Sequence, residues 1–429
     1  MLSFKTFKVG FIAGALLVIS GVVYYNQSLI ASAIPVVSNP VSMAGMSTER
    51  LARITPFFQK QVDDGKIAGA QMLVARRGEL VHFSSVGFQD KAKGTPLDEN
   101  TLFRIYSMTK PITAVAMMML YEEGKFQLTD PLYKYIPEFK DLVVYAGEDA
   151  DGNMLTEPAK RAPTMQDLMR HTAGFTYGIF SDTAVDKLYR SADVLKVDSS
   201  LDAMITKLSK IPLLYQPGEK WVYSVGVDIQ GYLIEKISGQ SFPDFLQERI
   251  FTPLGMNDSS FWVEGDKADR LMTTYMHDKE GDLVPSPMPR LADHFAKPGL
   301  YSGGGGLVSS SKDYWKFAQM VASGGTANGK RYLSPKTIDY MRLDHLPNGL
   351  SMTFAEGVGF GLGFAVITDP AATGVLTSKG EYFWGGLAST VFWIDPKEEI
   401  VAILMTQYLP TNSALRQDMR SLVYQALEE

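Results

Sequence analysis

The sequence predicts a mixed α/β (α+β) fold, in which an antiparallel sheet flanked by helices is joined to a mostly helical region. Strand-like apolar runs occur early in the chain, within residues 69–87, and again late, within residues 360–407. Helical patterns dominate between about residues 107 and 250. Strands at both ends of a chain can share one sheet when the helices between them form an insertion. We therefore expect a single sheet assembled from the two ends.

The boundaries follow from these patterns. We expect one domain over residues 46–429, with its sheet drawn from residues 46–105 and 300–429 and a helical subdomain over residues 106–299. Residues 34–45 contain two prolines and several small residues, which is typical of a linker. The groove between the sheet and the helical subdomain is the expected place for an active site, because pockets often form where such units meet.

The individual elements are predicted from the spacing of apolar residues. Residues 50–65 have helical spacing. Residues 69–87 contain two strand-like stretches around an Arg-Gly-Glu turn, which is typical of a hairpin. The later expectations are loops near residues 140–165 and 176–200, strands within residues 360–367, 382–396 and 399–407, and a closing amphipathic helix over residues 413–427.

Composition excludes several classes of function. The chain has 429 residues, of which 45% are apolar and 21% charged, as in an ordinary globular protein. A net charge of −6 gives no basic surface for nucleic acid. The absence of cysteine excludes thiol catalysis, disulfides and thiolate metal sites. The five histidines are scattered and form no His-Glu-x-x-His motif, so we predict no metal site and no cofactor. The sequence indicates no oligomeric state.

The N-terminal residues resemble an export signal. Lys5 and Lys8 precede the apolar run 9–25, and no charged residue follows until Glu49. This run is long enough to associate with or span a membrane, while Ala31-Ser32-Ala33 resembles a cleavage site. Residues 1–33 are therefore predicted as either a signal peptide or an N-terminal membrane anchor. Both alternatives place the rest of the chain outside the cytoplasm, either in the periplasm or anchored to the inner membrane and facing it.

Ser107 and Lys110 lie three residues apart at the start of the apolar run 111–120. Positions i and i+3 share one face of a helix, so the two side chains should touch. Burial removes the hydration of a lysine and disfavours its charged form. A neutral lysine can take the proton of serine, so Lys110 is expected to act as a base. The alternative is a helix start whose lysine turns out to water.

A second Ser-x-x-Lys pair, Ser309 and Lys312, has a simpler interpretation. Its serines should cap a helix in which Lys312 and Asp313 face solvent. The preceding glycines 303–306 lack the Gly-Lys-Ser/Thr that a phosphate-binding loop requires. They are expected to form a flexible turn beside the site.

Residues 103–139 resemble the first signature of the serine β-lactamase and penicillin-binding protein superfamily. The resemblance continues in residues 213–256, which contain Tyr223-Ser224, and in residues 383–389, which contain Trp384-Gly385-Gly386. It spans about residues 46–407 and is nearest to the branch of class C β-lactamases, DD-peptidases and family VIII carboxylesterases. It implies a β-lactamase/transpeptidase-like fold.

The resemblance also implies roles for individual residues. Ser107 would be the nucleophile, and Lys110 and Tyr223 would share the proton transfers. The backbone N–H groups of Ser107 and Leu387 would form the oxyanion hole. A Ser-His-Asp triad through His171 is the alternative, although the histidine at this position in the branch looks structural.

The residues at two positions favour an ester substrate. Trp384 and Val225 stand where the lactamases carry a lysine and an asparagine, so the polar groups that hold an anionic lactam are replaced by apolar surface. Glycines inside a strand suggest that another group approaches the backbone closely, so Gly385 and Gly386 join Trp384 and Val225 as expected substrate-binding residues. We expect a carboxylesterase for small-molecule esters of short to medium acyl chains. The alternatives are a β-lactamase, a DD-peptidase or amidase, an acyltransferase, and a non-catalytic membrane-tethered scaffold.

Overall fold

The computed structural model describes residues 44–287, 294–347, 349–352 and 355–428. All elements named below belong to the unit Val41–Glu429. The predicted signal peptide or anchor, and nearly all of the predicted linker, lie outside the described residues. None of the helices in the described part of the chain combines the length and apolar content needed to span a bilayer.

A large antiparallel sheet joins the early and late parts of the chain, as predicted. Its strands lie in the order β12-β13-β14-β15-β16-β1-β2-β3, and β1 pairs with β16 along its length. Every neighbouring pair is antiparallel. The strands are β1 (Gly69–Arg76), β2 (Glu79–Asp90), β3 (Thr95–Pro96), β12 (Val358–Phe360), β13 (Ala365–Ile367), β14 (Tyr382–Gly385), β15 (Val391–Asp395) and β16 (Ile400–Thr406).

The predicted hairpin between β1 and β2 is confirmed. Arg76 pairs with Glu79, so Arg77 and Gly78 form a two-residue turn. Both have positive φ angles, 52° and 79°, which is the geometry of the type I′ turn that matches strand twist.

Two late segments that were each predicted as one strand contain two. Residues 360–367 turn at Gly363, whose φ of 95° glycine adopts easily, and separate β12 from β13. Residues 382–396 turn at 386–390, where the N–H of Gly386 donates to the carbonyl of Thr390 at 2.9 Å. The apolar runs continue through these turns because both sides of each turn are buried.

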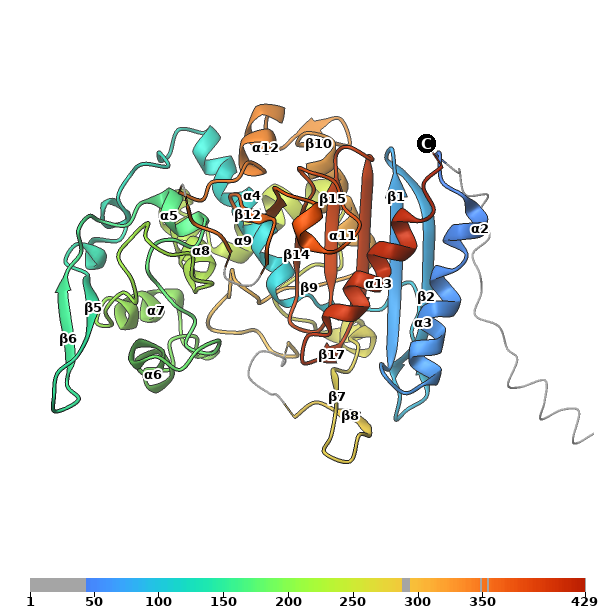
Figure 1. The fold of residues 1–429 in the computed structure, drawn as a ribbon, viewed down its shortest axis with the longest axis horizontal. Helices are drawn as coiled ribbons and strands as arrows, with labels where there is room; N and C mark the ends of the chain where they lie inside the picture. The colour runs from blue at the N-terminus through green and yellow to red at the C-terminus, as the bar shows by residue number, and fades with distance from the viewer. Residues whose placement is uncertain (1–43, 288–293, 348, 353–354, 429) are drawn as a thin grey trace, which may run out of the picture. The chain divides into compact units, whose positions relative to one another are not determined.

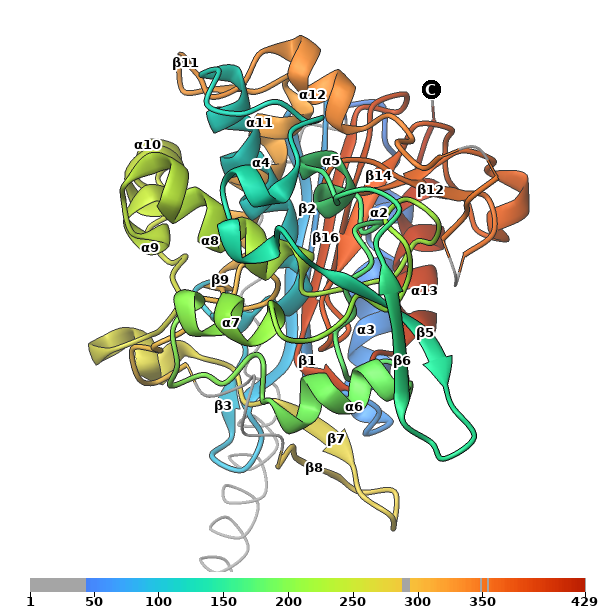
Figure 2. The same cartoon turned by 90° about the vertical axis from the view of Figure 1, so that its left-hand side faces the viewer.

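Both faces of the sheet are covered, which explains why its central strands read as continuous apolar runs. In β16, Ile400, Ala402 and Leu404 belong to the core shared with the helices α2 (Thr48–Leu51), α3 (Ile54–Asp63) and α13 (Ser413–Tyr424). Val401, Ile403 and Met405 alternate with them and belong to the core on the opposite face, which includes α11 (Ser311–Ala322) and the helical region. Figures 1 and 2 show α3 and α13 on one side of the sheet and α4 and α8 on the other.

The region between the two halves of the sheet is mostly helical, as predicted. Helix α4 is buried from Thr109 to Leu120 and packs against α8. The helices of this region are α4 (Thr109–Glu122), α5 (Met165–Met169), α6 (Ala184–Ser191), α7 (Leu201–Leu208), α8 (Gly226–Ser238), α9 (Phe242–Leu246) and α10 (Thr252–Leu254).

Two predicted loops contain regular structure. Residues 140–165 include the hairpin β5 (Val143–Glu148) and β6 (Met154–Pro158), whose largely exposed side chains leave no apolar pattern to recognise. Residues 176–200 include α6, which begins at a capping box formed by Thr183 and Asp186.

The remaining elements are short. They are β4 (Phe103–Arg104), β7 (Tyr275–His277), β8 (Leu283–Pro285), β9 (Val308–Ser309), β10 (Thr326–Ala327), β11 (Lys330–Arg331), β17 (Tyr408–Leu409), α12 (Pro335–Met341), the 3₁₀-helices η1 (Tyr106–Met108), η2 (Leu132–Lys134), η3 (Pro137–Phe139), η5 (Gly265–Arg270) and η6 (Ala371–Thr373), and the π-helix η4 (Gln247–Phe251).

Candidate active site

Ser107 lies in η1, two residues before α4 begins. The preceding residue, Tyr106, has a φ of 43°, which is strained for a bulky side chain and is tolerated only where the surroundings enforce it. The segment is fixed on both sides, because Ile105 N–H donates to the carbonyl of Leu307 at 3.0 Å and the hydroxyl of Tyr314 donates to the carbonyl of Met108 at 3.0 Å. This strained turn presents Ser107 at a large cavity.

Lys110 is almost completely removed from water, with 1% of its surface exposed. Its Nζ donates to Ser107 Oγ at 3.2 Å, to Tyr177 Oη at 3.2 Å and to the carbonyl oxygen of Gly304 at 2.5 Å. The ammonium also lies 4.5 Å from the ring centroid of Tyr223 and 5.1 Å from that of Tyr177. The expectation that this lysine enters the helix on its buried side is confirmed, and one of its three hydrogen bonds is made to the serine.

Tyr223 lies in the loop before α8 and donates its hydroxyl hydrogen to Ser107 Oγ at 2.7 Å. Its ring is held between Tyr177 and Trp384, whose centroids each lie 5.4 Å away. The three residues predicted to carry the chemistry, Ser107, Lys110 and Tyr223, therefore meet at one oxygen. The fold brings Ser107 and Tyr223, which are 116 positions apart in the chain, within hydrogen-bonding distance.

His171 takes no part in this cluster of hydrogen bonds. Its Nδ1 lies 3.0 Å from Ser224 Oγ, and its Nε2 is buried without a hydrogen-bond partner among the described residues. Burial, aided by the charge of Lys110, holds the pKa of His171 well below its usual value. A neutral imidazole with no bond to Ser107 does not form the alternative triad, and its contacts are those of a structural residue.

Two residues that sequence reasoning missed lie behind Lys110. Asp228, on α8, accepts hydrogen bonds from Ser302 Oγ at 2.5 Å, from Gly304 N–H at 3.1 Å and from Tyr177 Oη at 3.4 Å. Burial raises the pKa of Asp228, although the charge of Lys110 opposes this rise. Burial and the charge of Asp228 raise the pKa of Tyr177 well above its usual value, so Tyr177 remains a neutral phenol between the lysine and the carboxyl group.

The glycines 303–306 are fixed rather than flexible, which corrects the expectation for this turn. Gly303 accepts a hydrogen bond from Thr113 Oγ1 at 2.9 Å, and Gly304 both donates to Asp228 and accepts from Lys110. A side chain on Gly304 would lie 2.5 Å from Asp228 Oδ2 and from Tyr177 Oη. Glycine is needed here because other groups approach the backbone closely.

Other groups also approach the backbone closely at the end of β14, as the sequence predicted from the two glycines there. A methyl group on Gly386 would collide with the carbonyl oxygen of Ile105 and with Thr390 Oγ1. A methyl group on Gly385 would lie 2.7 Å from Cζ of Arg416. Glycine at 386 allows the strand to lie against the segment that precedes Ser107, and glycine at 385 leaves room for the side chain of Arg416.

The predicted oxyanion donors line the same cavity. Ser107 and Leu387 both face it, and neither backbone N–H has a hydrogen-bond acceptor among the residues that the structure describes. The carbonyl of Leu387 is fixed by Thr411 Oγ1 at 2.7 Å. Both N–H groups are thus free to bind a substrate oxygen, and their catalytic role stays a prediction.

The cavity has a volume of about 1150 Å³ and a mainly apolar lining. Trp384, Gly385 and Gly386 line it, as expected for substrate-binding residues. Val225 does not, and this expectation is corrected: its side chain is fully buried in the core at the start of α8. Other apolar lining residues are Ile179, Phe180, Trp221, Phe383 and Val391.

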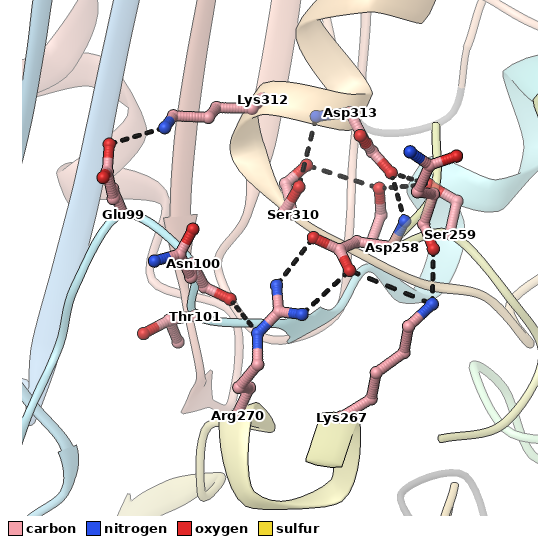
Figure 3. A network of polar contacts seen from close by, with 12 residues as sticks. Glu99, Asn100, Thr101, Asp258, Ser259, Lys267, Arg270, Ser310, Lys312 and Asp313 are labelled. Carbon is pink, nitrogen blue, oxygen red and sulfur yellow. Dashed lines mark hydrogen bonds and ion pairs between the residues drawn. The ribbon is translucent and has the colours of Figure 1, made fainter. Parts of the chain in front are cut away.

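The second Ser-x-x-Lys pair has a different environment, and Figure 3 shows its lysine, Lys312, directed at Glu99. Lys312 Nζ forms an ion pair with Glu99 at 2.5 Å, and both side chains are partly exposed. Ser309 Oγ lies 2.8 Å from Ser259 Oγ. No hydrogen bond joins Ser309 to Lys312 in the described part of the chain, so this pair is structural.

The start of α11 confirms the predicted serine cap but not the predicted exposure of Asp313. Ser310 caps α11 by accepting the N–H of Asp313 at 3.2 Å. Asp313 was expected to face solvent, but its side chain is buried and accepts the N–H of Asp258 at 2.7 Å. This bond ties α11 to the loop around residue 258 (Figure 3).

The described residues contain no group of three or more His, Asp or Glu side chains arranged to hold a metal ion. The polar groups that converge on Ser107 are the amino group of Lys110 and the hydroxyl of Tyr223. Such a site can activate a serine hydroxyl and return its proton to a leaving group.

Comparisons with known proteins agree with this arrangement. A family model described as Beta-lactamase matches residues 54–426. Protein Rv1367c of Mycobacterium tuberculosis is 34% identical over 358 residues, covering 81% of this chain and 88% of that protein. Esterase EstB of Burkholderia gladioli is 29% identical, covering 90% of this chain and 98% of that protein. The solved structure of EstCE1, a hydrolase with promiscuous acyltransferase activity, is similar with a TM-score of 0.75 and 25% identity, covering 88% of this chain and 99% of its own.

Proposed function

This chain belongs to the Beta-lactamase family and is a serine hydrolase of that family, and from this premise we propose that it hydrolyses carboxylic esters of short to medium acyl chains through an acyl-enzyme intermediate on Ser107. One observation carries the proposal. Lys110 Nζ and Tyr223 Oη both bond to Ser107 Oγ at the edge of an apolar cavity.

In the acylation step, Ser107 Oγ attacks the ester carbonyl while its proton passes to the Lys110–Tyr223 pair, which enters the step with one of its own protons already lost, as a lysine amine or a tyrosine phenolate. The bond from Oγ to the acyl carbon forms, and the carbonyl oxygen gains negative charge. The free N–H groups of Ser107 and Leu387 bind that oxygen. The tetrahedral intermediate then collapses, the bond to the alcohol oxygen breaks, and Tyr223 returns a proton to the departing alcohol.

Deacylation repeats the chemistry with water as the nucleophile. Tyr223 is 2.7 Å from Ser107 Oγ, and as the phenolate left after protonation of the alcohol it can accept a proton from a water that approaches the acyl carbon. The water oxygen bonds to the acyl carbon, and the bond to Ser107 breaks. Ser107 takes back a proton, the carboxylic acid leaves, and the starting state is restored.

The lining of the cavity supports an ester over a lactam. Trp384 packs on Tyr223 and Phe360 and directs apolar surface into the cavity. Its indole Nε1 is buried without a partner among the described residues, so this ring supplies no exposed cation or donor. Short and medium acyl chains gain free energy when such a surface takes them out of water. Esterase EstB, as a relative, supports the same reaction type.

The test compares p-nitrophenyl butanoate with nitrocefin, a chromogenic β-lactam. We expect kcat/KM for the ester to exceed that for the lactam, and we expect Ser107→Ala to abolish turnover of both. The variant Ser309→Ala is the matched control, because its hydroxyl belongs to the structural Ser-x-x-Lys pair. Faster turnover of nitrocefin would reverse the proposed ranking, and undiminished turnover by Ser107→Ala would refute the nucleophile.

A further inference from the structure

Two buried carboxyl groups beside α13 contact the same phenol. Glu381 lies directly before β14, and Asp395 is the last residue of β15. Both side chains are fully buried. The hydroxyl oxygen of Tyr424, the last residue of α13, lies 2.7 Å from Glu381 Oε2 and 2.7 Å from Asp395 Oδ2. The phenol therefore joins the helix to the ends of two neighbouring strands.

These two contacts need two hydrogens, and the phenol has one. Two oxygens that lie 2.7 Å apart normally have a hydrogen between them. Tyr424 is a neutral phenol, because burial and the two carboxyl groups beside it raise its pKa well above the usual value. Its single hydrogen can be donated to one carboxylate at a time. The second contact is a hydrogen bond only if the other carboxyl group carries a proton.

Glu381 also faces the cation of this cluster. Arg420, on α13, places its Nη1 2.6 Å from Glu381 Oε1 and 2.7 Å from Oε2. The hydroxyl of Thr377 donates to Oε2 at 2.7 Å. Burial raises the pKa of Glu381, although the charge of Arg420 opposes this rise. A proton bound here is held more tightly than by a carboxyl group in water.

The contacts of Asp395 leave one oxygen for the phenol. Its Oδ1 accepts the N–H groups of Lys397 at 3.0 Å and Glu398 at 3.2 Å, so Oδ2 is the oxygen that faces Tyr424. A hydrogen on Oδ2 can be donated to the phenol while the phenol donates to Glu381. Each of the 2.7 Å contacts is then a hydrogen bond. The proton belongs to the coupled pair rather than to one carboxyl group.

One shared proton also balances the charges of the cluster. Among the described residues, Arg420 is the cation that forms an ion pair with these carboxyl groups. The next cations are bound elsewhere, because Arg416 donates to the carbonyl of Gly386 and Arg76 donates to the carbonyl of Glu398. Two ionised carboxylates beside one guanidinium would bury a net negative charge, which is costly. With one proton the cluster is neutral.

We propose that Glu381, Tyr424 and Asp395 form a buried proton-binding site, which holds one proton at pH values where carboxyl groups in water are ionised. The proton completes the hydrogen bonds that fasten α13 to the ends of β14 and β15. The unfolded chain releases this proton above about pH 4, so the fold loses stability as the pH rises until the site itself is deprotonated. The inference does not depend on the proposed ester hydrolysis.

Asp395→Asn tests the site, because an asparagine supplies a hydrogen that does not dissociate. Its carbonyl oxygen can accept the same backbone N–H groups, and its amide can donate to Tyr424. The equilibrium constant for unfolding should be closest to the wild-type value near pH 4 and then fall below it, by up to about tenfold per pH unit. Urea titrations from about pH 4 to 8 measure this difference. A constant difference, or a wild-type advantage that grows with pH, would overturn the proposal.

Two further variants separate the proton from general effects on stability. Tyr424→Phe keeps the ring, which stacks on Trp393 with centroids 6.5 Å apart, and removes the bridging hydroxyl. Two buried hydrogen bonds are lost, so the equilibrium constant for unfolding at about pH 6 should rise about 10-fold or more, whereas Asp395→Asn should lower it. A comparable rise in both variants would mean that Asp395 acts as a charge, which contradicts the proposal. Asp182→Asn, which removes an exposed carboxylate, is the control and should follow wild type at each pH.

Infrared spectroscopy detects the bound proton directly. The carbonyl band of a neutral carboxyl group is separate from the bands of a carboxylate. At pH 6, about two units above the usual carboxyl pKa values, the wild-type spectrum minus that of Asp395→Asn should contain this band. The buried Asp228 contributes equally to both spectra and cancels. A difference spectrum without the band would overturn the proposal, and neither the unfolding nor the infrared measurement requires ester hydrolysis.

Discussion

At the scale of single residues, the site depends on how Lys110 is surrounded. Within the described part of the chain, no carboxylate lies within ion-pair distance of its ammonium, which contacts two hydroxyl groups, a carbonyl oxygen and two aromatic faces. Asp228 sits behind this shell and reaches Lys110 only through Tyr177 and Gly304. One hydrogen bond of the Lys110 amino group is therefore made to Ser107, and none of its bonds within the described residues is a salt bridge.

The hydroxyl of Tyr223 gives a direct prediction at this scale. Tyr223→Phe keeps the ring contacts with Tyr177 and Trp384 but removes the group that bonds to Ser107. We expect kcat/KM for p-nitrophenyl butanoate to fall by about 10²–10⁴, the usual contribution of a positioned acid or base. Steady-state kinetics at several pH values measures this effect.

Tyr301→Phe is the matched control for that variant. Tyr301 packs on Phe261 and Trp262 and does not line the cavity in the described structure. Its loss of a hydroxyl should leave kcat/KM within a factor of about two, as for a substitution away from the reacting atoms. Comparable losses in both variants would remove Tyr223 from the proposed mechanism.

The three converging residues were predictable from the sequence, and their neighbours were not. Ser107 and Lys110 are close in sequence on one helix face, so local spacing predicts their contact. Tyr223 was placed by the resemblance of its motif. Tyr177 and Arg416 reach the site through long-range packing that no spacing rule describes. Asp228 left a signal that could have been used, because it is the charged residue within the apolar stretch 225–234.

At the scale of elements, the active site requires the end of β14 to lie against the turn that carries Ser107. Gly386 makes this contact possible, because the space that a side chain at this position would need is filled by the carbonyl oxygen of Ile105 and by Thr390 Oγ1. The sequence predicted a close approach at these glycines but not which group approaches. It also merged β14 with β15, because the apolar pattern continues through the turn between them.

Gly386→Ala tests this contact between elements. The added methyl group has to displace the carbonyl of Ile105, so we expect an activity loss of about 10-fold or more and a lower Tm. Gly305→Ala is the comparison, because a methyl group there would meet its nearest atom at 3.7 Å, an ordinary contact. Thermal unfolding should show a decrease for Gly386→Ala and a Tm near wild type for Gly305→Ala. A wild-type Tm and activity for Gly386→Ala would contradict the close packing.

At the scale of the whole molecule, the sheet ties the two ends of the chain together, and buried polar contacts around α5 stabilise the helical region. Asp167, on α5, accepts hydrogen bonds from Arg161, Arg170 and Thr164. The sheet could be predicted because both of its faces are covered, so its central strands form continuous apolar runs in the sequence. The hairpin β5–β6 could not, because its side chains are mostly exposed.

The stability of the molecule should depend on the ionisation of Asp167. Burial acts to raise the pKa of Asp167, but hydrogen bonds from Arg161, Thr164 and Arg170 outweigh it and hold the pKa at about 2. A carboxyl group with a depressed pKa stabilises the fold above its unfolded pKa of about 3.9 and loses that contribution as pH falls toward 2. The shift corresponds to about 2–3 kcal/mol of the free energy of unfolding at neutral pH.

Denaturant titration of Asp167→Asn measures this contribution. The variant should lose about 2–3 kcal/mol at pH 7, and its difference from wild type should shrink as the pH is lowered from about 5 to 3. Asp182→Asn is the control, because Asp182 is exposed and its ion pair with Arg190 should add little. A difference for Asp167→Asn that stays constant with pH would show that the carboxylate charge is not its source.

The most direct test of Ser107 as the activated nucleophile is intact-mass spectrometry after incubation with a fluorophosphonate, followed by peptide mapping. We predict one covalent adduct per chain on the serine at position 107, and no adduct in the Ser107→Ala variant. Adduct formation should slow strongly in Lys110→Gln and stay at the wild-type rate in Lys312→Gln, whose lysine pairs with Glu99. An unlabelled wild-type chain, or an adduct mapped to Ser309, would contradict the proposal that the lysine and the tyrosine activate this serine.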